Sequence, residues 1–450
     1  MNILVFASEF APYNVTGTFR TLNFVNCLAD LGFTIHVVTL TESCANQIFG
    51  VSQIDAALTS DNPSIIIHRV INDRMFNQYG RAASYFRSRL DTGGDFLRHM
   101  SKLVDSITFS AIYATQPHAA TVLIARDAAS LFRLKLILDM RDTWSAWAIA
   151  PFKTRLHYWL VKSAERRLFQ QASHIVTVTD EVREIFVRDH GEHLRSKVSI
   201  IPNSFVRPLP PTVYYPGFRS KELITIGYVG SFYFRPDLNF EMKRKWYRRK
   251  GLKKFEYYSS KEDWLYRSPY FFLSALKLIL LEHPELSGRV KVEFIGQRHN
   301  WLVDMVEGMG LTSMCIFNGF LAKEALDKKI LGFDYLLATS EKVINGRHFC
   351  LPSKLFEYIS YGKPILGFVT KGSQMDFIEK SRAGRVFNPD ELEVAAAQLL
   401  ETLYHQGVSV IDQEYLENFS LSRNCKTLSK IIWDCAVSST EAPVLASWKQ

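Results

Sequence analysis

Hydrophobic and polar positions follow two different periods along the chain. In the first half, short apolar runs rich in β-branched residues predict strands, at 2–7, 34–40, 64–70, 111–115, 135–140 and 174–179. Between several of these runs the apolar residues recur with a helical period and predict helices, at 18–32, 118–132 and 155–171. Strands that lack polar alternation are typical of parallel sheets covered on both faces. The first half therefore predicts an α/β domain.

A proline-rich segment interrupts this alternation. Residues 202–218, PNSFVRPLPPTVYYPGF, include five prolines and predict a linker. Strand patterns then restart, at 223–230, 289–296, 314–319, 333–339 and 364–369. Helical patterns lie between and after these strands, and the last two cover 390–405 and 421–437. The second half therefore repeats the α/β pattern of the first.

The two patterns together predict two doubly wound, Rossmann-like domains that face a cleft. We expect an N-terminal domain over 1–201, a proline-rich linker over 202–222 and a C-terminal domain over 223–410. A C-terminal helix within 411–437 can pack back on the N-terminal domain, and 438–450 is expected to be a loose tail. Ligands of such sheets bind at the carboxyl ends of the strands, so candidate residues are sought there.

Composition narrows the class of protein. With 450 residues, 47% of them hydrophobic and 22% charged, the chain is typical of a soluble globular protein. The formal net charge of +9 favours an anionic partner such as a nucleotide, a phospholipid surface or a nucleic acid. Six scattered cysteines without a C-x-x-C pair predict reduced thiols and argue against a zinc site. The apolar runs are too short for a signal peptide or a spanning helix, so we expect a cytoplasmic protein that is soluble or peripheral on a membrane.

The segment PSKLFEYISYGKPILG, residues 352–367, carries candidate chemistry on a short predicted helix. Ser353 is a candidate N-cap, and the first N–H groups of a helix with Lys354 beside them can bind a phosphate. Glu357 lies one turn further along, where its carboxylate can accept hydrogen bonds from the diol of a ribose. A diphosphate and a ribose indicate a nucleotide. The alternative is an ordinary amphipathic helix whose Lys354 and Glu357 side chains are simply solvated.

Five segments, in order across both predicted domains, resemble a known family. They are FAPYNVTGTFRTLNFVNCLADLGFTIHVVTL (10–40), LILDMRDTW (136–144), IVTVTDEV (175–182), YVGSFY (228–233) and PSKLFEYISYGKPILG (352–367). These segments are similar to the retaining family-four glycosyltransferases with the GT-B fold, and most similar to the bacterial branch that builds O-antigen, capsule and exopolysaccharide. The resemblance implies a hexosyltransferase-like enzyme that uses a nucleotide-diphosphate sugar.

The resemblance also implies which residues bind the donor. Lys354 and the helix amides would neutralise the diphosphate leaving group, whose charge grows in the transition state. Glu357 would bind the ribose hydroxyls. The remaining donor contacts implied in this way are Gly17, Arg20, Gly230, Ser231, Arg267, Ser353 and Leu355. The family needs no metal for this chemistry, and a simple turn glycine is the alternative for Gly17.

Four residues at predicted strand ends are candidate catalytic groups. Asp139, Arg141 and Asp142 end a buried strand, where they could contact the donor sugar or orient the acceptor hydroxyl. The alternative is a structural Asp–Arg pair that stabilises the strand end, because unpaired charges are costly there. His118 follows another strand end, although a histidine near a helix start often has no catalytic role.

Two departures from the family pattern affect this interpretation. Phe349 occupies the position of the first of two family glutamates, and Phe349 cannot hydrogen-bond a sugar. An insertion at 234–267 separates the first strand of the C-terminal domain from its helix. The diphosphate-binding arginine could therefore be Arg267 or Arg235, and the sequence RSPYFFLSAL after the insertion favours Arg267.

The insertion has a distinctive composition. From Arg235 to Arg267 it contains eleven Lys/Arg and five Asp/Glu with many aromatic residues between them. This pattern is typical of a segment that lies on an anionic membrane, and it also occurs in single-stranded nucleic-acid platforms. A solvated charged run is the third alternative. A lipid-linked acceptor favours the membrane and makes nucleic acid an unlikely partner.

The resemblance therefore implies a retaining, metal-independent glycosyltransferase without a bound cofactor. Its donor is a UDP- or GDP-linked sugar, its acceptor is a glycan or a lipid-linked glycan, and its pathway is cell-surface polysaccharide or lipopolysaccharide synthesis. We expect a cytoplasmic protein. If it associates with a membrane, we expect a peripheral association with the inner face of the plasma membrane. Two alternatives remain, a GT-B-fold binding or scaffold protein without activity and a nucleotide-sugar epimerase of the same architecture.

Overall fold

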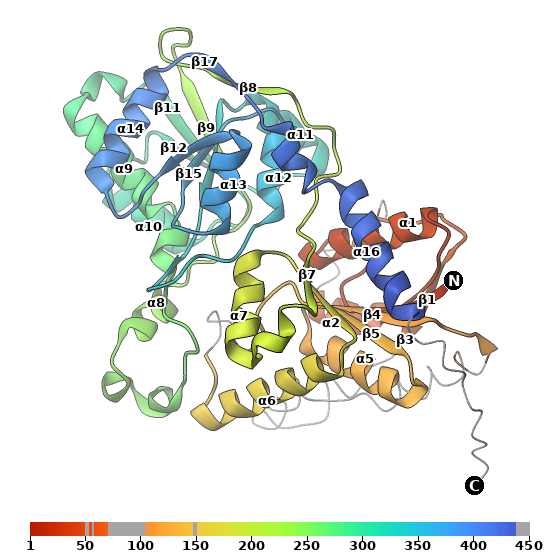
Figure 1. Cartoon of the computed structure of the whole chain (residues 1–450). Helices are drawn as coiled ribbons and strands as arrows, with labels where there is room; N and C mark the ends of the chain where they lie inside the picture. Colours follow the sequence, from red (N-terminus) through yellow and green to blue (C-terminus); the bar gives the residue numbers. More distant parts are fainter. Residues whose placement is uncertain (50–53, 56–57, 71–103, 105, 147–150, 438–450) are drawn as a thin grey trace. The chain divides into compact units, whose positions relative to one another are not determined.

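The computed structural model describes residues 1–49, 54–55, 58–70, 104, 106–146 and 151–437. The predicted tail at 438–450 lies outside these residues. The chain forms two compact units, and each is described here by itself (Figure 1). The first unit contains the described residues up to Pro202, apart from Pro151, and the last helix, which begins at Leu421. The second unit contains Pro151 and Asn203–Ser420.

The first unit is built on a seven-stranded parallel sheet in the order β3-β2-β1-β4-β5-β6-β7. Its strands are β1 (Asn2–Ala7), β2 (Thr34–Leu40), β3 (Ile65–Val70), β4 (Ala111–Thr115), β5 (Lys135–Asp139), β6 (His174–Thr177) and β7 (Val198–Ile200). The chain order reverses between β1 and β4, as at the switch point of a Rossmann sheet. All six strands predicted in the first half are present, and β7 is an addition.

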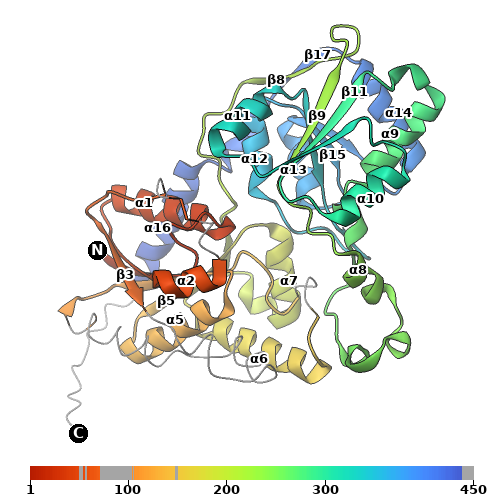
Figure 2. The same ribbon diagram turned by 180° about the vertical axis from the view of Figure 1, so that it is seen from behind.

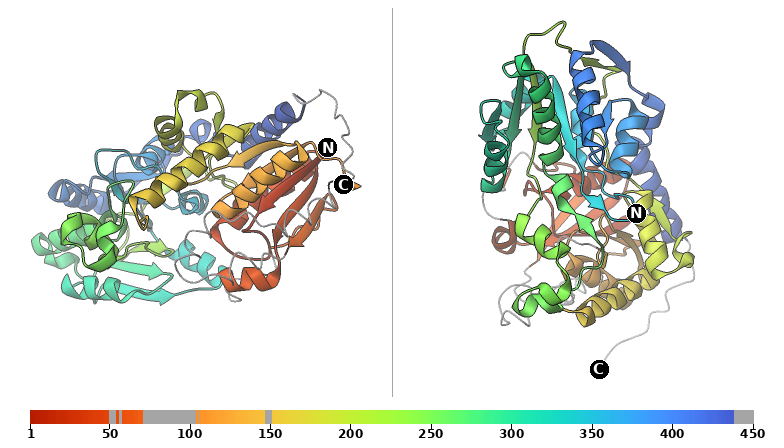
Figure 3. Two further views of the ribbon diagram at one scale, coloured as in Figure 1. Left: turned by 90° about the horizontal axis from the view of Figure 1, so that it is seen from below. Right: turned by 90° about the vertical axis from the view of Figure 1, so that its left-hand side faces the viewer.

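Helices cover both faces of this sheet. They are α1 (Thr16–Asp30), α2 (Glu42–Phe49), α5 (Ala119–Phe132), α6 (Arg155–Gln171), α7 (Asp180–His190) and α16 (Leu421–Val437). Figures 1 and 3 show α1 and α16 over one face and α5 and α6 over the other. The apolar strand residues have no polar alternation because both faces are buried, and Leu4 and Val5 have no exposed surface.

The last helix belongs to the first unit although it ends the described chain. Cys425, Leu428 and Ile432 of α16 pack in the same apolar core as the strands. Cys27 of α1 and Cys425 form a disulfide across 398 positions of sequence. The prediction of reduced, unpaired cysteines is therefore wrong for this pair, because the fold brings together two residues that no local spacing connects.

The second unit contains a six-stranded parallel sheet in the order β12-β11-β9-β13-β15-β16. Its strands are β9 (Ile224–Val229), β11 (Val290–Ile295), β12 (Cys315–Gly319), β13 (Tyr335–Thr339), β15 (Ile365–Phe368) and β16 (Gly384–Phe387). Its helices are α9 (Tyr270–Glu282), α10 (Asn300–Gly308), α11 (Lys323–Gly332), α12 (Ser353–Ser360), α13 (Ser373–Ser381), α14 (Leu392–Tyr404) and α15 (Gln413–Glu417). Figure 2 shows these helices on both sides of the sheet. The predicted fold class, two Rossmann-like α/β domains, is confirmed.

The predicted linker at 202–222 is wrong, because most of it is part of the second unit. Strand β8 (Thr212–Tyr215) pairs with β17 (Gly407–Val410) in an antiparallel ribbon. Val213 and Tyr215 are buried in the core of the unit. Prolines flank this strand, but they leave its own backbone N–H groups available for pairing.

The insertion at 234–267 forms α8 (Pro236–Lys243), a succession of 3₁₀ turns and a short strand. The turns are η4 (Trp246–Arg248), η5 (Gly251–Phe255) and η6 (Trp264–Arg267). Strand β10 (Glu262–Asp263) pairs with β14 (Lys342–Val343), which follows β13. The end of the insertion is therefore bound to the loop that leads toward α12. Among the described helices, none combines the length and the hydropathy needed to cross a membrane.

Candidate functional site

Helix α12 in the second unit begins at Ser353, and its N-cap is Pro352. The prediction that Ser353 is the N-cap is wrong, because proline's fixed backbone angle supplies the extended conformation one residue earlier. Leu355 is fully buried, and its amide donates to the Pro352 carbonyl at 3.2 Å. Leu355 therefore supports the helix from the core and does not offer its amide to a ligand. Glu357 is exposed on the same helix, as the predicted ribose contact requires.

Lys354 reaches from α12 to the first strand of the sheet. Its Nζ donates to the hydroxyl of Tyr228 on β9 at 2.8 Å and lies 4.1 Å from the centre of that ring. Burial, and then the positive charge of Arg267, lower the pKa of Lys354 to about 7. The structure thus brings Lys354 and Arg267 close enough to repel one another, and an anion between them would relieve this repulsion.

Arg267 is fixed by a carboxylate that the sequence did not single out as a donor residue. Its Nη1 donates to Glu341 Oε2 at 3.0 Å, and the other oxygen of Glu341 lies 3.1 Å from His348 Nε2. Burial opposes ionisation of Glu341, but Arg267 and His348 outweigh burial and keep the pKa of Glu341 well below its ordinary value. Arg235, the alternative to Arg267, is exposed at the start of α8. Arg267 is therefore the arginine that the structure places near Lys354.

The loop after β9 contains the two other predicted donor residues of this unit. Gly230 has φ +110°, which favours glycine, and a Cβ there would meet no atom within 4 Å. Open space beside Gly230 suits a position that a ligand approaches closely. The carbonyl of Ser231 accepts a hydrogen bond from Tyr228 at 3.3 Å. Ser231 and Lys354 are thus connected through the Tyr228 hydroxyl.

A second polar cluster lies in the first unit, at the carboxyl ends of β1, β4 and β5. The amide of Gly17 donates to Glu9 Oε2 at 2.6 Å, and a Cβ on Gly17 would lie 2.0 Å from that oxygen. Arg141 Nη2 lies 4.0 Å from Glu9 Oε2, and His118 Nε2 lies 3.8 Å from Glu9 Oε1. Gly17 lies in the first turn of α1, and its lack of a side chain leaves room there for the ends of the Glu9 and Arg141 side chains. Glu9 is a site residue that sequence reasoning missed, although it follows β1 by two positions.

The charges in this cluster influence one another. Burial raises the pKa of Glu9, against the opposing effects of Arg141 and the Gly17 amide. Burial and Arg141 lower the pKa of His118, so the imidazole is neutral at neutral pH. Asp142 is half-buried, and its amide donates to the Gln116 side chain at 3.3 Å. These three side chains can hydrogen-bond a hydroxylated ligand: the Glu9 carboxylate accepts, the Arg141 guanidinium donates, and a neutral His118 can do either.

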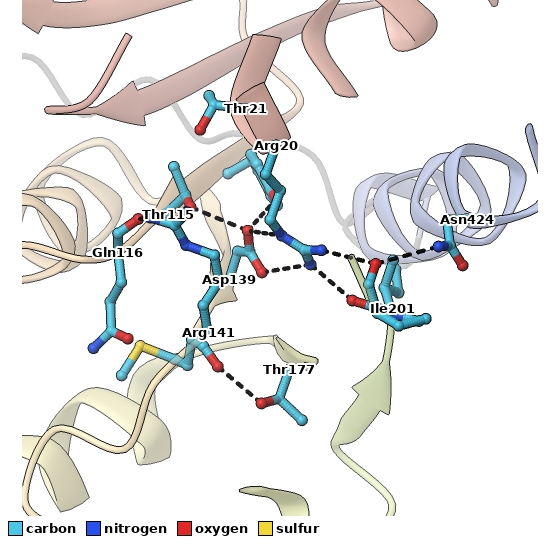
Figure 4. Close-up of polar contacts among 12 residues, drawn as sticks. Arg20, Thr21, Thr115, Gln116, Asp139, Arg141, Thr177, Ile201 and Asn424 are labelled. Atoms are coloured by element: carbon cyan, nitrogen blue, oxygen red, sulfur yellow. Dashed lines mark hydrogen bonds and ion pairs between the residues drawn. The ribbon is translucent and has the colours of Figure 1, made fainter. Parts of the chain in front are cut away.

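Asp139 and Arg20 form a buried ion pair that is separate from the two polar clusters. Arg20 donates to both carboxylate oxygens of Asp139, at 3.0 and 2.9 Å, and also to the carbonyls of Ile201 and Pro202 (Figure 4). Asp139 has no exposed surface and also accepts from Tyr113 and Thr115. Burial opposes ionisation of Asp139, but Arg20 outweighs it and lowers the pKa.

This pair corrects two predictions. The structure places Asp139 and Arg20 in a buried ion pair and not at an open ligand site, because both oxygens of Asp139 accept from protein donors and Arg20 donates only to protein oxygens. The expected structural Asp–Arg pair exists, but its arginine comes from α1 and not from Arg141. The pair joins α1, β5 and the segment after β7.

Comparisons with known proteins support the two-domain α/β fold, and one family model matches residues of the first unit. Residues 17–204 match the family described as "Glycosyl transferase 4-like domain". No curated protein sequence matches the chain significantly.

Solved structures with the same fold extend over the whole chain. Anabaena Alr3699/HepE, solved with UDP and glucose, matches with a TM-score of 0.52 and 12% identity over 98% of each chain. The lipopolysaccharide outer core galactosyltransferase WaaB, in its apo form, matches with a TM-score of 0.52 and 12% identity over 98% of this chain and 99% of that one. Sucrose-phosphate synthase from Thermosynechococcus elongatus matches with a TM-score of 0.53 and 12% identity over 97% of this chain and 96% of that one. At these identities the likeness shows the fold alone, which is two Rossmann-like α/β domains in one chain.

Proposed function

We propose that the protein is a glycosyltransferase that takes a sugar from a nucleotide-diphosphate donor. The observation that carries this proposal is the pair of cationic side chains, Lys354 and Arg267, beside the N-terminus of α12 with Glu357 exposed one turn away. The glycosyl transferase 4-like domain in the first unit supports the reaction class. HepE, which has the same fold, was solved with UDP and with UDP-glucose, and this supports a UDP-linked donor over a GDP-linked one.

In the proposed reaction, the residues of the second unit bind the leaving group. Lys354, Arg267 and the first amides of α12 neutralise the diphosphate as the glycosidic bond breaks, and this charge stabilisation is strongest in the transition state. Glu357 accepts hydrogen bonds from the ribose hydroxyls. Because these cations perform the role of a metal, the proposed reaction needs neither a metal nor another cofactor. Glu341 holds Arg267 in place as a positioning residue.

In the first unit, His118, Arg141 and Asp142 remain candidates for contact with the donor sugar or the acceptor. We propose that the sugar is transferred with retention of its anomeric configuration, as the family resemblance implies. The proposed acceptor is a glycan or a lipid-linked glycan of cell-surface polysaccharide or lipopolysaccharide synthesis. Such an acceptor would place the enzyme in the cytoplasm at the inner face of the plasma membrane.

A binding protein without catalytic activity is the second candidate. Phe349, at the position of the first family glutamate, is 8% exposed, and its ring stacks near His348 at a centroid distance of 6.1 Å. Phe349 thus contributes packing where a carboxylate would contact sugar. A nucleotide-sugar epimerase is a further alternative, since the fold alone does not determine the reaction.

A thermal-shift screen of UDP, GDP and their sugar conjugates tests the donor site. We expect one nucleotide to raise the Tm of the wild-type protein and of Lys380→Met, a control on the exposed face of α13. The same nucleotide should raise the Tm of Lys354→Met much less. If no nucleoside diphosphate shifts the wild-type Tm, or if Lys354→Met responds like the control, the donor site is misplaced.

A further inference from the structure

The insertion presents large apolar side chains to solvent in one short stretch. We call residues 240–255 the insertion lobe. Within it Leu252 is 84% exposed, Trp246 is 66% exposed and Phe255 is 63% exposed, and Phe240 and Tyr247 are also exposed. A soluble protein gains nothing from such a concentration of exposed apolar surface, and it marks a surface where something binds.

The same lobe carries a strong positive charge. It contains eight Lys/Arg and one Asp/Glu, so its formal charge is 8 − 1 = +7. The one acidic residue, Glu241, forms an ion pair with Arg244 at 3.3 Å. Lys245, Arg248 and Lys250 are exposed in η4 and beside it, and Lys253 and Lys254 are exposed in η5. Apolar and basic side chains therefore lie on the same two 3₁₀ turns.

The lobe is held in shape and joined to the donor site. Arg249, which is buried, donates to the Glu256 carbonyl at 3.0 Å and lies 4.7 Å from the Tyr258 ring centre. At its base, the Asn239 side chain accepts from the Trp264 amide at 2.9 Å. Trp264 opens the turn that ends at Arg267. Figures 1 and 2 show that the lobe includes the end of α8 and continues beyond it, at one end of the second unit.

We propose that the insertion lobe is a membrane-docking surface that binds anionic phospholipid. Trp246, Leu252 and Phe255 enter the interface between headgroups and acyl chains, and the surrounding Lys and Arg side chains contact the headgroup phosphates. The choice of a lipid surface over a nucleic acid rests on Leu252, the most exposed of these side chains, which has no ring face on which a base could stack. The inference rests on the proposed function for one point only, that a lipid-linked acceptor gives the enzyme a reason to dock.

Co-sedimentation of the full chain with vesicles tests this surface. Vesicles of phosphatidylcholine alone are compared with vesicles that contain 30% phosphatidylglycerol (about one lipid in three), at roughly 0.1 M and 0.5 M NaCl. Electrostatic attraction weakens over this range because the Debye length falls from about 10 Å at 0.1 M toward about 3 Å at 1 M. We expect binding to the anionic vesicles at low salt, and at least about tenfold weaker binding at high salt or without phosphatidylglycerol.

Point substitutions test the lobe directly. Unlike a deletion of the insertion, they leave strand β10 in place. Leu252→Ser/Phe255→Ser should weaken vesicle binding at least about tenfold. The matched control, Leu281→Ser/Leu331→Ser, changes two other exposed leucines of the same unit and should bind like wild type. All of these side chains are exposed, so the variants should keep the wild-type Tm.

Three results would overturn the inference. They are no binding to anionic vesicles at low salt, equal binding by Leu252→Ser/Phe255→Ser and wild type, and binding of a single-stranded oligonucleotide by the lobe without binding of vesicles. The nucleotide-induced rise in Tm is measured on the same samples. If vesicles bind through the lobe but no nucleotide raises the Tm, the membrane surface stands and the proposed function fails.

Discussion

Donor affinity should fall as pH rises, because the site depends on the charge of Lys354. Burial and Arg267 lower the pKa of this lysine in the free protein from 10.5 to about 7. A bound diphosphate favours the ammonium form and moves the pKa back toward its ordinary value, so binding takes up a proton above pH 7. Above the pKa of the free protein, each pH unit then costs about 1.4 kcal/mol of binding, or about tenfold in Kd. From pH 7 to pH 9 the expected increase in Kd is about fiftyfold.

Calorimetric titration with a nucleotide sugar measures this slope between pH 6 and pH 9. Both phosphates of such a donor are esterified, so the ligand itself does not titrate in this range. Lys354→Met should bind weakly with a nearly flat profile. Glu262→Gln controls for a second group, since burial and the nearby Glu341 raise the pKa of Glu262 to about 7. A wild-type Kd that varies less than twofold, or an equal slope in Lys354→Met, would refute the role given to Lys354.

Three further outcomes follow from the same contacts. Asp139→Asn should lower the free energy of unfolding by about 3–5 kcal/mol, because Arg20 is left buried without its counterion; a loss below about 1 kcal/mol in urea denaturation would argue against the pair. Glu357→Ala should abolish measurable sugar transfer and weaken donor binding, with each lost hydrogen bond to the carboxylate worth about 1.5–3 kcal/mol; wild-type transfer would make Glu357 a solvated helix residue. Transfer should survive EDTA, and a strict requirement for added Mg²⁺ or Mn²⁺ would mean that the cationic side chains do not replace a metal.

The sequence was informative about the fold because strand and helix periods are local properties. Parallel strands buried on both faces have no polar alternation, and runs such as 2–7 and 135–140 appear where the structure has β1 and β5. The proline-rich segment misled because composition was taken as evidence of a linker. Val213 and Tyr215 of this segment instead pair with strand β17 and pack in the core of the second unit. The pairing strand lies almost two hundred positions later in the sequence.

The placement of the candidate residues on a helix was predictable where one short motif carries them. Lys354 and Glu357 lie on α12 as expected, since their spacing on a helix is fixed locally. Contacts between side chains that are far apart in the sequence could not be predicted from local patterns. Arg20 and Asp139 are 119 positions apart, and only the fold shows that they neutralise one another. The pairing of Glu341 with Arg267 was not predicted for the same reason, because Arg267 lies 74 positions earlier.

Release of nucleoside diphosphate from a panel of nucleotide sugars tests the central claim most directly. The assay compares the wild-type protein with Lys354→Met and with the surface control Lys380→Met, in the presence of membrane extracts that supply acceptors. We predict that wild type and Lys380→Met release the diphosphate from at least one donor, with transfer of the sugar to an acceptor, and that Lys354→Met releases it at least about a hundredfold more slowly. Tight nucleotide binding without turnover of any donor would contradict the account and support a binding protein of the same fold.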